Sequence, residues 1–214
     1  MSSDEFIVTP WHVEGDIDYD KLIKQFGTQK ISTDLLQRFQ RITGEDHFML
    51  RRGVFFSHRD LNLILENYEK GKEFFLYTGR GPSGHTHIGH MVPWVFAKWL
   101  QDKFNVNMYF QLTDDEKFFS KQNITLEQTK NFALENTLDF LALGFNPEKT
   151  KVLIDTENIK TLYPIAAEIA KKINFSNTKA VFGFTNDTNV GMIFYTSLQL
   201  SLIHISEPTR RYAI

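Results

Sequence analysis

A strand, a glycine-rich turn and a helix follow one another without interruption over residues 74–104, and this succession most limits the possible folds. Residues 74–78 are apolar and aromatic, as in a β-strand, and the next six residues include three glycines and a proline. From Ile88 onward apolar residues recur with helical spacing. Because Pro93 lacks an N–H and crowds the carbonyl four residues earlier, the helix is predicted to begin close to His87–His90.

This helix start has the properties of a phosphate site. Unpaired backbone N–H groups and the helix dipole attract an anion there, and glycine lets a phosphate approach the backbone closely. His87 and His90 lie three residues apart, so both imidazoles are expected beside that position as hydrogen-bond donors. The segment therefore predicts a nucleotide site.

Other interpretations of the same residues stay open at this point. Residues 79–86 fit the phosphate-loop pattern except that His85 replaces its lysine, which favours another kind of site over a phosphate-loop NTPase. Three nearby histidines also suggest zinc, but the chain has no cysteine and no carboxylates at ligand spacing nearby. The simplest alternative is a glycine turn between a core strand and a core helix.

After residue 73 strands and helices alternate, which predicts an α/β fold with a parallel sheet. Strands are expected at Asn107–Leu112 and Lys151–Ile154, and a helix at Leu162–Ile173 with Pro164 in its first turn. Another helix begins after a Thr125 cap, and its buried face is predicted to contain Leu126, Ala133, Leu134, Leu138 and Leu141.

Ligands of such sheets bind beyond the carboxyl ends of the strands, where Tyr77, Gln111 and Thr113 are expected. The neighbouring carboxylates Asp114 and Asp115 either lie in a solvated turn or bind Mg²⁺.

The first 72 residues are expected to form a small extension that precedes this sheet. A short hairpin or an extended segment is predicted at Val8–Asp18, followed by helices at Tyr19–Phe26, Asp34–Ile42 and Asp60–Tyr68. Ser57 or Asp60 is expected to cap the last helix, and glycines close all three. The predicted domains are 1–72, 73–199 and 200–214.

Composition favours a globular protein without a membrane segment. Of 214 residues, 42% are hydrophobic, the net charge is −2, and cysteine is absent. No apolar run approaches membrane-spanning length, and the N-terminus has no targeting pattern, so the cytoplasm is the expected compartment. A nucleic-acid partner would have to bind local basic patches, since no overall basic charge exists.

His87-Ile88-Gly89-His90 is the HIGH signature. The sequence around it resembles the class I aminoacyl-tRNA synthetases, specifically the eukaryotic cytosolic type of tryptophanyl-tRNA synthetase. The resemblance extends from about Val8 to Gln199 and thins between Asn158 and Lys172. It is carried by residues 8–27, 51–84, 96–106 and 111–118, which include VTPWHVEGDIDYDKLIKQFG and QLTDDEKF.

The resemblance implies a Rossmann-like catalytic domain and a tryptophan–tRNA ligase. Such enzymes activate tryptophan with ATP, accompanied by Mg²⁺, and transfer it to tRNA(Trp), and they act as homodimers in protein biosynthesis. No protein nucleophile is required. The hairpin within residues 8–15 would then close over the nucleotide.

The resemblance also implies a role for individual residues. His87, His90 and Lys117 would be catalytic. The expected ATP contacts are Arg80, Gly81, His87, Gly89, His90 and Thr113. The expected tryptophan contacts are Tyr77, Gly79, Gln111, Glu116 and Lys117. No metal ligand is expected.

Several parts of the family's pattern are missing. Neither a KMSKS-type loop, nor a second half of the nucleotide fold, nor an anticodon-binding domain follows, so the 214 residues are expected to be an inactive N-terminal part. The alternatives are a non-catalytic tryptophan- or ATP-binding module and a phosphate-loop-like NTPase. Residues 200–214 lack a clear amphipathic period and resemble a translated sequencing adapter up to Arg210, which predicts a non-native tail.

Overall fold

The computed structural model describes residues 7–8, 13–14 and 19–206. The chain divides into two compact units, Met1–Phe74 and Phe75–Ile214. Each unit is described by itself. The end of the predicted tail, residues 207–214, and the tip of the predicted hairpin, residues 9–12, lie outside the described residues.

The first unit contains the predicted hairpin and the predicted helices. Strands β1 (Ile7–Val8) and β2 (Val13–Glu14) pair antiparallel, as do β3 (Gln29–Lys30) and β4 (Ser57–His58). The helices are α1 (Tyr19–Gln25), α2 (Thr33–Thr43), α3 (Phe48–Arg51) and α4 (Leu61–Glu69). The pair β3–β4 and helix α3 were not predicted, because elements of two to four residues are too short to show a periodicity.

The predicted cap of α4 is wrong. Asp60 has a left-handed backbone with φ of 58° and makes no capping bond, whereas capping residues usually have an extended backbone. Nδ1 of His58 accepts the hydrogen bond from the Leu61 N–H instead, at 3.2 Å. The predicted glycine stops are confirmed at Gly44 and Gly71, whose φ angles of 77° and 75° suit glycine.

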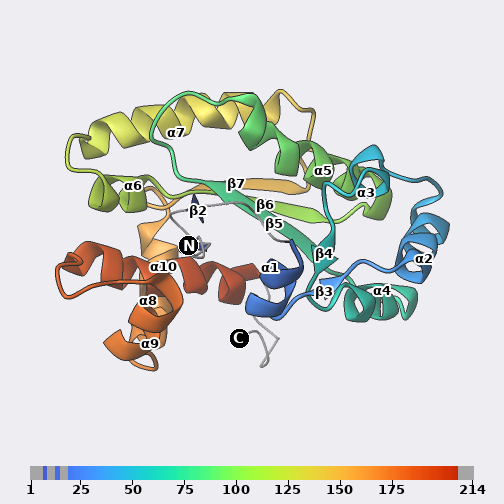
Figure 1. Cartoon of the computed structure of the whole chain (residues 1–214). Coiled ribbons are helices and arrows are strands. Elements are labelled where there is room, and N and C mark those ends of the chain that lie inside the picture. The colour runs from blue at the N-terminus through green and yellow to red at the C-terminus, as the bar shows by residue number, and fades with distance from the viewer. Residues whose placement is uncertain (1–6, 9–12, 15–18, 207–214) are drawn as a thin grey trace. The chain divides into compact units, whose positions relative to one another are not determined.

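The second unit is built on a parallel three-stranded sheet with the order β5–β6–β7, which confirms the predicted α/β class. Its strands are β5 (Phe75–Arg80), β6 (Asn107–Leu112) and β7 (Thr150–Ile154). Its helices are α5 (Ile88–Phe104), α6 (Asp114–Ser120), α7 (Leu126–Leu141), α8 (Ile159–Ala170), α9 (Phe175–Phe182) and α10 (Val190–Ser206). Helices α5 and α7 cover one face of the sheet, and α8 and α10 cover the other (Figure 1).

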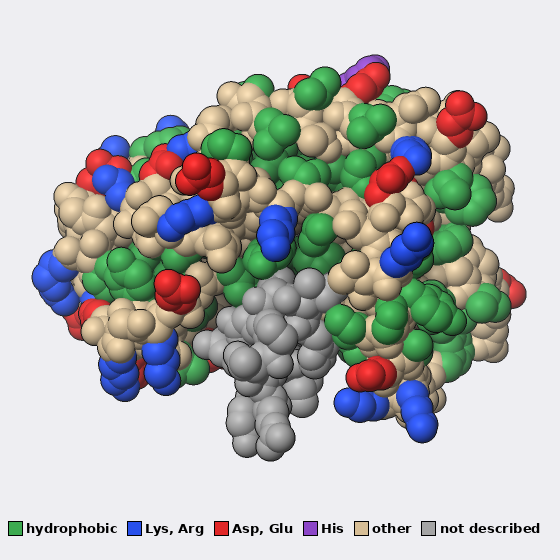
Figure 2. Space-filling model, turned by 180° about the vertical axis from the view of Figure 1, so that it is seen from behind, with side chains coloured by type: hydrophobic (Ala, Val, Ile, Leu, Met, Phe, Trp, Pro, Cys, Tyr) green, Lys and Arg blue, Asp and Glu red, His purple; other side chains and the backbone are tan. Residues whose placement is uncertain are grey.

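The surface mixes charges of both signs. On the face shown in Figure 2, lysine and arginine side chains are interspersed with acidic and hydrophobic ones. Among the described residues, no helix has both the length and the apolar character that crossing a membrane requires.

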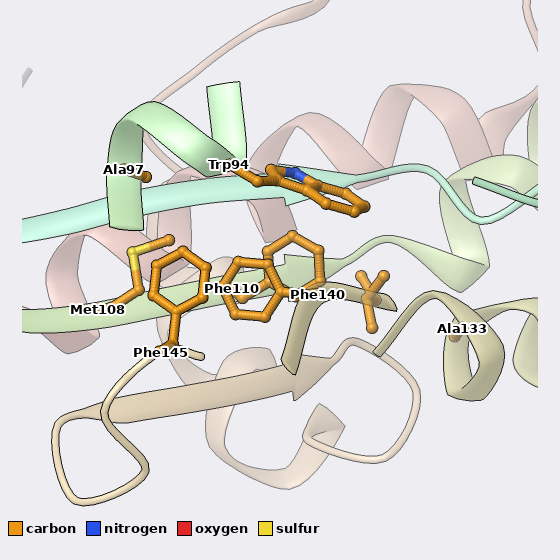
Figure 3. Close-up of a cluster of buried hydrophobic side chains, with 8 residues drawn as sticks. Trp94, Ala97, Met108, Phe110, Ala133, Phe140 and Phe145 are labelled. Atoms are coloured by element: carbon orange, nitrogen blue, oxygen red, sulfur yellow. The ribbon is translucent and has the colours of Figure 1, made fainter. Parts of the chain in front are cut away.

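The core between the sheet and helices α5 and α7 is aromatic (Figure 3). The ring of Phe140 stacks on Phe110 with centroids 3.8 Å apart and on Phe145 at 4.1 Å. Trp94 of α5 meets Phe110 edge to face at 5.2 Å. Such contacts add to the free energy gained by burying the rings, so this cluster fixes α5 and α7 on the sheet.

The predicted buried face of α7 is largely wrong. Ala133 is buried as expected, but Leu134 and Leu138 are 52% and 69% exposed, and Leu126 and Leu141 are each 42% exposed. The buried face consists of Thr129, Ala133, Asn136 and Phe140. Polar residues are stable on this face because each forms hydrogen bonds: Asn136 binds the carbonyl of Gly84, and Thr129 donates to the Leu126 carbonyl.

Helices α8 and α10 form a second cluster on the opposite face of the sheet, with Leu162, Ala166, Tyr195, Leu198 and Leu202 buried. Helix α8 begins at Ile159, so Pro164 lies inside the helix and not in its first turn as predicted. Helix α10 was not predicted and continues through Ser206, which brings Leu202 into this cluster. Leu202 is thus buried although residues 200–214 lack a clear amphipathic period.

Candidate functional site

Tyr77 and Gln111 meet on the sheet, as the sequence predicts, but Tyr77 lies in the middle of its strand and only Gln111 lies next to the carboxyl end of its own. They lie on neighbouring strands β5 and β6, and the Tyr77 hydroxyl donates a hydrogen bond to Oε1 of Gln111. Desolvation, with a contribution from Asp155, raises the pKa of Tyr77 to about 12, so its hydroxyl stays a donor near neutral pH. Glycine is needed at position 79, opposite Gln111, because a Cβ there would lie 2.7 Å from the Gln111 carbonyl oxygen.

Asp155 completes this group and was missed by the sequence analysis. It directly follows β7 and is fully buried, and Nε2 of Gln111 donates to its two carboxyl oxygens at 2.8 and 2.9 Å. Burial and the neighbouring Asp115 raise the pKa of Asp155 well above its usual value. The rule that selected Tyr77 and Gln111 would have found Asp155 if applied to the third strand.

The acidic start of α6 is buried. Asp114 accepts a hydrogen bond from the Thr156 N–H at 3.1 Å, and Asp115 accepts one from the Glu116 N–H at 2.8 Å. Burial raises the pKa of Asp115 to about 6. Of the two interpretations that the sequence left open, a solvated turn is therefore wrong. Within the described part of the chain, no three His, Asp or Glu side chains group as metal ligands.

Glu116 and Lys117 form an ion pair beside the glycine turn. Lys117 Nζ lies 3.1 Å from Oε1 and 3.0 Å from Oε2 of Glu116, and the Thr113 hydroxyl donates to the same carboxylate at 3.3 Å. A Cβ at Gly81 would lie 1.9 Å from Cε of Lys117. The structure thus brings together Gly81, Thr113, Glu116 and Lys117, as the resemblance implied.

The two histidines at the start of α5 cap their own helix. Nδ1 of His87 accepts from the Gly89 N–H, and Nδ1 of His90 accepts from the His87 N–H, both at 3.2 Å. The two rings lie 3.6 Å apart. Burial, followed by the charges of Arg80 and His87, lowers the pKa of His90. An Nδ1 that accepts carries no proton, so in the neutral rings the proton is on Nε2, which is available to donate to a ligand.

The Arg80 side chain hydrogen-bonds to the glycine turn and to α7. Its guanidinium donates to Oδ1 of Asn136 and to the carbonyls of Gly84 and His85, the latter two at 3.0 Å. Arg80 therefore holds the glycine turn against α7. Asn136, on the buried face of α7, was missed by the sequence analysis.

His85 is separate from the other two histidines in its contacts. It pairs with Glu135 of α7 at 3.1 Å and is mostly exposed. A phosphate loop would need a long cation at this position, so these contacts favour neither that loop nor a shared zinc site.

Tyr195 of α10 lies within reach of the same polar group. It is buried, and its pKa is raised by burial and then by the charges of Asp155, Glu116, Tyr77 and Asp115. Because α10 has apolar residues on all sides, its sequence does not indicate which residue faces the sheet.

The sequence of the second unit matches a family model. Residues 69–199 fit the model of the class I tRNA synthetases of the W and Y type. The chain belongs to this family. The matched region contains the strand ends, the glycine turn and the histidine pair described above.

Relatives and solved structures agree with this membership. The tryptophan–tRNA ligase of Saccharolobus solfataricus is 57% identical over 92% of this chain and 52% of its own length. A tryptophanyl-tRNA synthetase structure from Plasmodium falciparum superposes with a TM-score of 0.83 at 44% identity, covering 87% of this chain and 54% of that one. One from Encephalitozoon cuniculi, bound to tryptophan, gives 0.83 at 37%, covering 86% and 55%.

The chain spans about half the length of the curated relatives that it matches. The eukaryotic cytosolic type is not confirmed, because the archaeal relatives Saccharolobus solfataricus and Sulfurisphaera tokodaii, at 57% and 56%, are more identical to this chain than the Plasmodium falciparum protein at 44%.

Proposed function

We propose that the protein to which this chain belongs is a tryptophan–tRNA ligase, and that this chain contributes its tryptophan pocket and part of its ATP site. The observation that carries the proposal is the hydrogen-bonded pair of Tyr77 and Gln111 on neighbouring strands of the sheet. The names of the relatives, which match over more than nine-tenths of this chain, support the same reaction.

The Tyr77–Gln111 pair suits an indole ring. Indole is apolar with one N–H donor, and Oε1 of Gln111 is an acceptor whose second lone pair can receive it. A side chain without that donor would leave the buried acceptor unpaired, which costs more than a missing methylene group in an apolar pocket. Glu116 would bind the amino group, and Gly79 allows the close approach of the Gln111 backbone.

The chemistry of activation requires positioning and charge stabilisation. A carboxylate oxygen of tryptophan attacks the α-phosphorus of ATP, the bond to the bridging oxygen breaks, and pyrophosphate leaves. His87 and His90 would donate Nε2–H hydrogen bonds to phosphate oxygens, since their Nδ1 atoms accept from the helix backbone. Lys117 would supply a positive charge to the carboxylate or phosphate.

Other residues would shape the ATP site. Gly81 and Gly89 leave space near Lys117 and His87, respectively, and Thr113 holds the Glu116 carboxylate. Arg80 would act by fixing the turn rather than by touching the nucleotide. Mg²⁺ would arrive with the phosphates of ATP, because the described residues offer it no ready group of three ligands.

The remaining partners rest on the relatives and on the resemblance. Transfer to tRNA(Trp), a homodimer, and a cytoplasmic location belong to the proposal. The eukaryotic cytosolic type rests on the resemblance alone.

An ATP–pyrophosphate exchange assay of the full-length gene product, with each standard amino acid in turn, tests the proposal. Exchange stimulated by tryptophan is expected. Stimulation by tyrosine instead would refute the specificity, and ATP hydrolysis independent of amino acids would favour the NTPase alternative. Tryptophan binding without any exchange would favour the non-catalytic binding module.

A further inference from the structure

We infer that Asp155 is a specificity-determining positioning residue, which fixes the side-chain amide of Gln111 so that its oxygen, and not its nitrogen, faces the amino-acid pocket. This inference rests on the proposed function of the Tyr77–Gln111 pair. It adds a residue that the sequence analysis missed.

The argument begins with the symmetry of an amide. The oxygen and nitrogen of Gln111 have nearly the same shape, so packing alone does not decide which one faces the pocket. The contacts do. Nε2 donates to both carboxyl oxygens of Asp155, at 2.8 and 2.9 Å, while Oε1 accepts from the Tyr77 hydroxyl.

A rotated amide would place its oxygen against the oxygens of Asp155. The side chains of Gln111 and Asp155 are both fully buried, so water does not screen this repulsion. Rotation would also turn the NH₂ group toward the pocket. There it would face the indole N–H, and two hydrogen-bond donors would meet. Asp155 thus makes Gln111 present a hydrogen-bond acceptor, and not a donor, to the pocket.

Asp155 is itself firmly held at this position. Its backbone N–H extends the ladder of the sheet by donating to the Leu112 carbonyl at 3.1 Å. Asp115 interacts with its carboxyl group from α6, and a proton shared between the two would still leave Asp155 an oxygen that accepts from the amide. The carboxyl group is therefore anchored by the third strand, independently of the ligand.

The test compares tryptophan with an analogue in which sulfur replaces the indole N–H, using pyrophosphate exchange by the full-length protein. Wild type should prefer tryptophan by at least about a hundredfold in kcat/KM, because the analogue leaves the acceptor unpaired. Asp155→Leu should reduce this preference by at least about tenfold, with most of the change in the KM of tryptophan. Asp155→Asn, whose side-chain oxygen can still accept from the amide, should restore the preference to within about threefold of wild type.

The outcomes separate the two proposals. A wild type that tryptophan does not stimulate refutes the proposed function. A wild type with the expected preference, together with an Asp155→Leu variant that loses activity toward both substrates equally, refutes only the positioning role, because a purely structural defect does not change the ratio. If Asp155→Leu does not fold, as judged by circular dichroism, the same ratio measured for Asp155→Ala decides, and an unchanged ratio contradicts the inference.

Discussion

Replacing Gly81 with alanine would test whether Lys117 acts on the substrates. A Cβ at this position would lie 1.9 Å from Cε and 3.0 Å from Cδ of Lys117, and 2.9 Å from Oε2 of Glu116. Gly81 does not have a left-handed φ, so the effect of the new methyl group is steric and not conformational. Glu116 is buried and cannot move far, so the lysine must leave its position.

The size of the effect follows from what Lys117 loses. Its side chain is long and 22% exposed, so it can swing into solvent. This leaves the buried Glu116 carboxylate without its ion-pair partner, and we expect the free energy of unfolding to fall by about 1–3 kcal/mol. If Lys117 stabilises charge on the reacting carboxylate or phosphate, the transition state loses about 2–4 kcal/mol. This corresponds to a decrease of roughly 30- to 1,000-fold in kcat/KM.

Pyrophosphate exchange by the full-length protein measures this decrease. Gly84→Ala is the matched control, since it lies in the same turn but has nothing within 4 Å of a built Cβ, and it should behave as wild type. Lys117→Ala should reproduce the decrease, and the double variant Gly81→Ala/Lys117→Ala should be no worse than Lys117→Ala alone. Wild-type exchange by Gly81→Ala, or additive losses in the double variant, would refute the reasoning.

Three further predictions concern stability, measured by urea unfolding. Since burial raises the pKa of Asp115 to about 6, above the value of about 4 in an unfolded chain, the folded state binds more protons between these pH values, and the free energy of unfolding should fall as pH rises through them. Asp115→Asn should flatten this pH dependence and raise the free energy of unfolding by about 2–3 kcal/mol at pH 7. A pH dependence identical to that of wild type would contradict this prediction. Phe110→Ala should lower the free energy of unfolding by about 3–5 kcal/mol, because it removes the ring stacked at 3.8 Å on Phe140. Leu138→Ala, on the exposed face of α7, should change it by less than about 0.5 kcal/mol. Equal effects of the two substitutions would indicate that the leucine face is the buried one. Leu202→Ala should cost about 2–4 kcal/mol, because this side chain is 1% exposed, and a neutral result would indicate that the end of α10 adds nothing to the core.

The sequence was sufficient where local chemistry decides. The strand–turn–helix succession around HIGH, the start of α5 close to His87–His90 and the Thr125 cap of α7 were all predicted, because glycine, proline and capping side chains act on their own neighbours. The meeting of Tyr77 with Gln111 also followed, since parallel strands bring their carboxyl ends to one edge.

Only the tertiary structure decided which polar side chains are buried. Apolar periodicity favoured the leucine face of α7. Asn136 is buried instead because Arg80, which lies 56 residues earlier in the chain, donates a hydrogen bond to it. Asp155 likewise depends on Gln111, which lies 44 residues away. The pattern of apolar residues along a chain does not record such distant partners, whereas a buried polar group is stable only where they converge. The strand–turn–helix segment was therefore predictable from its own residues, whereas the orientation of the Gln111 amide was not.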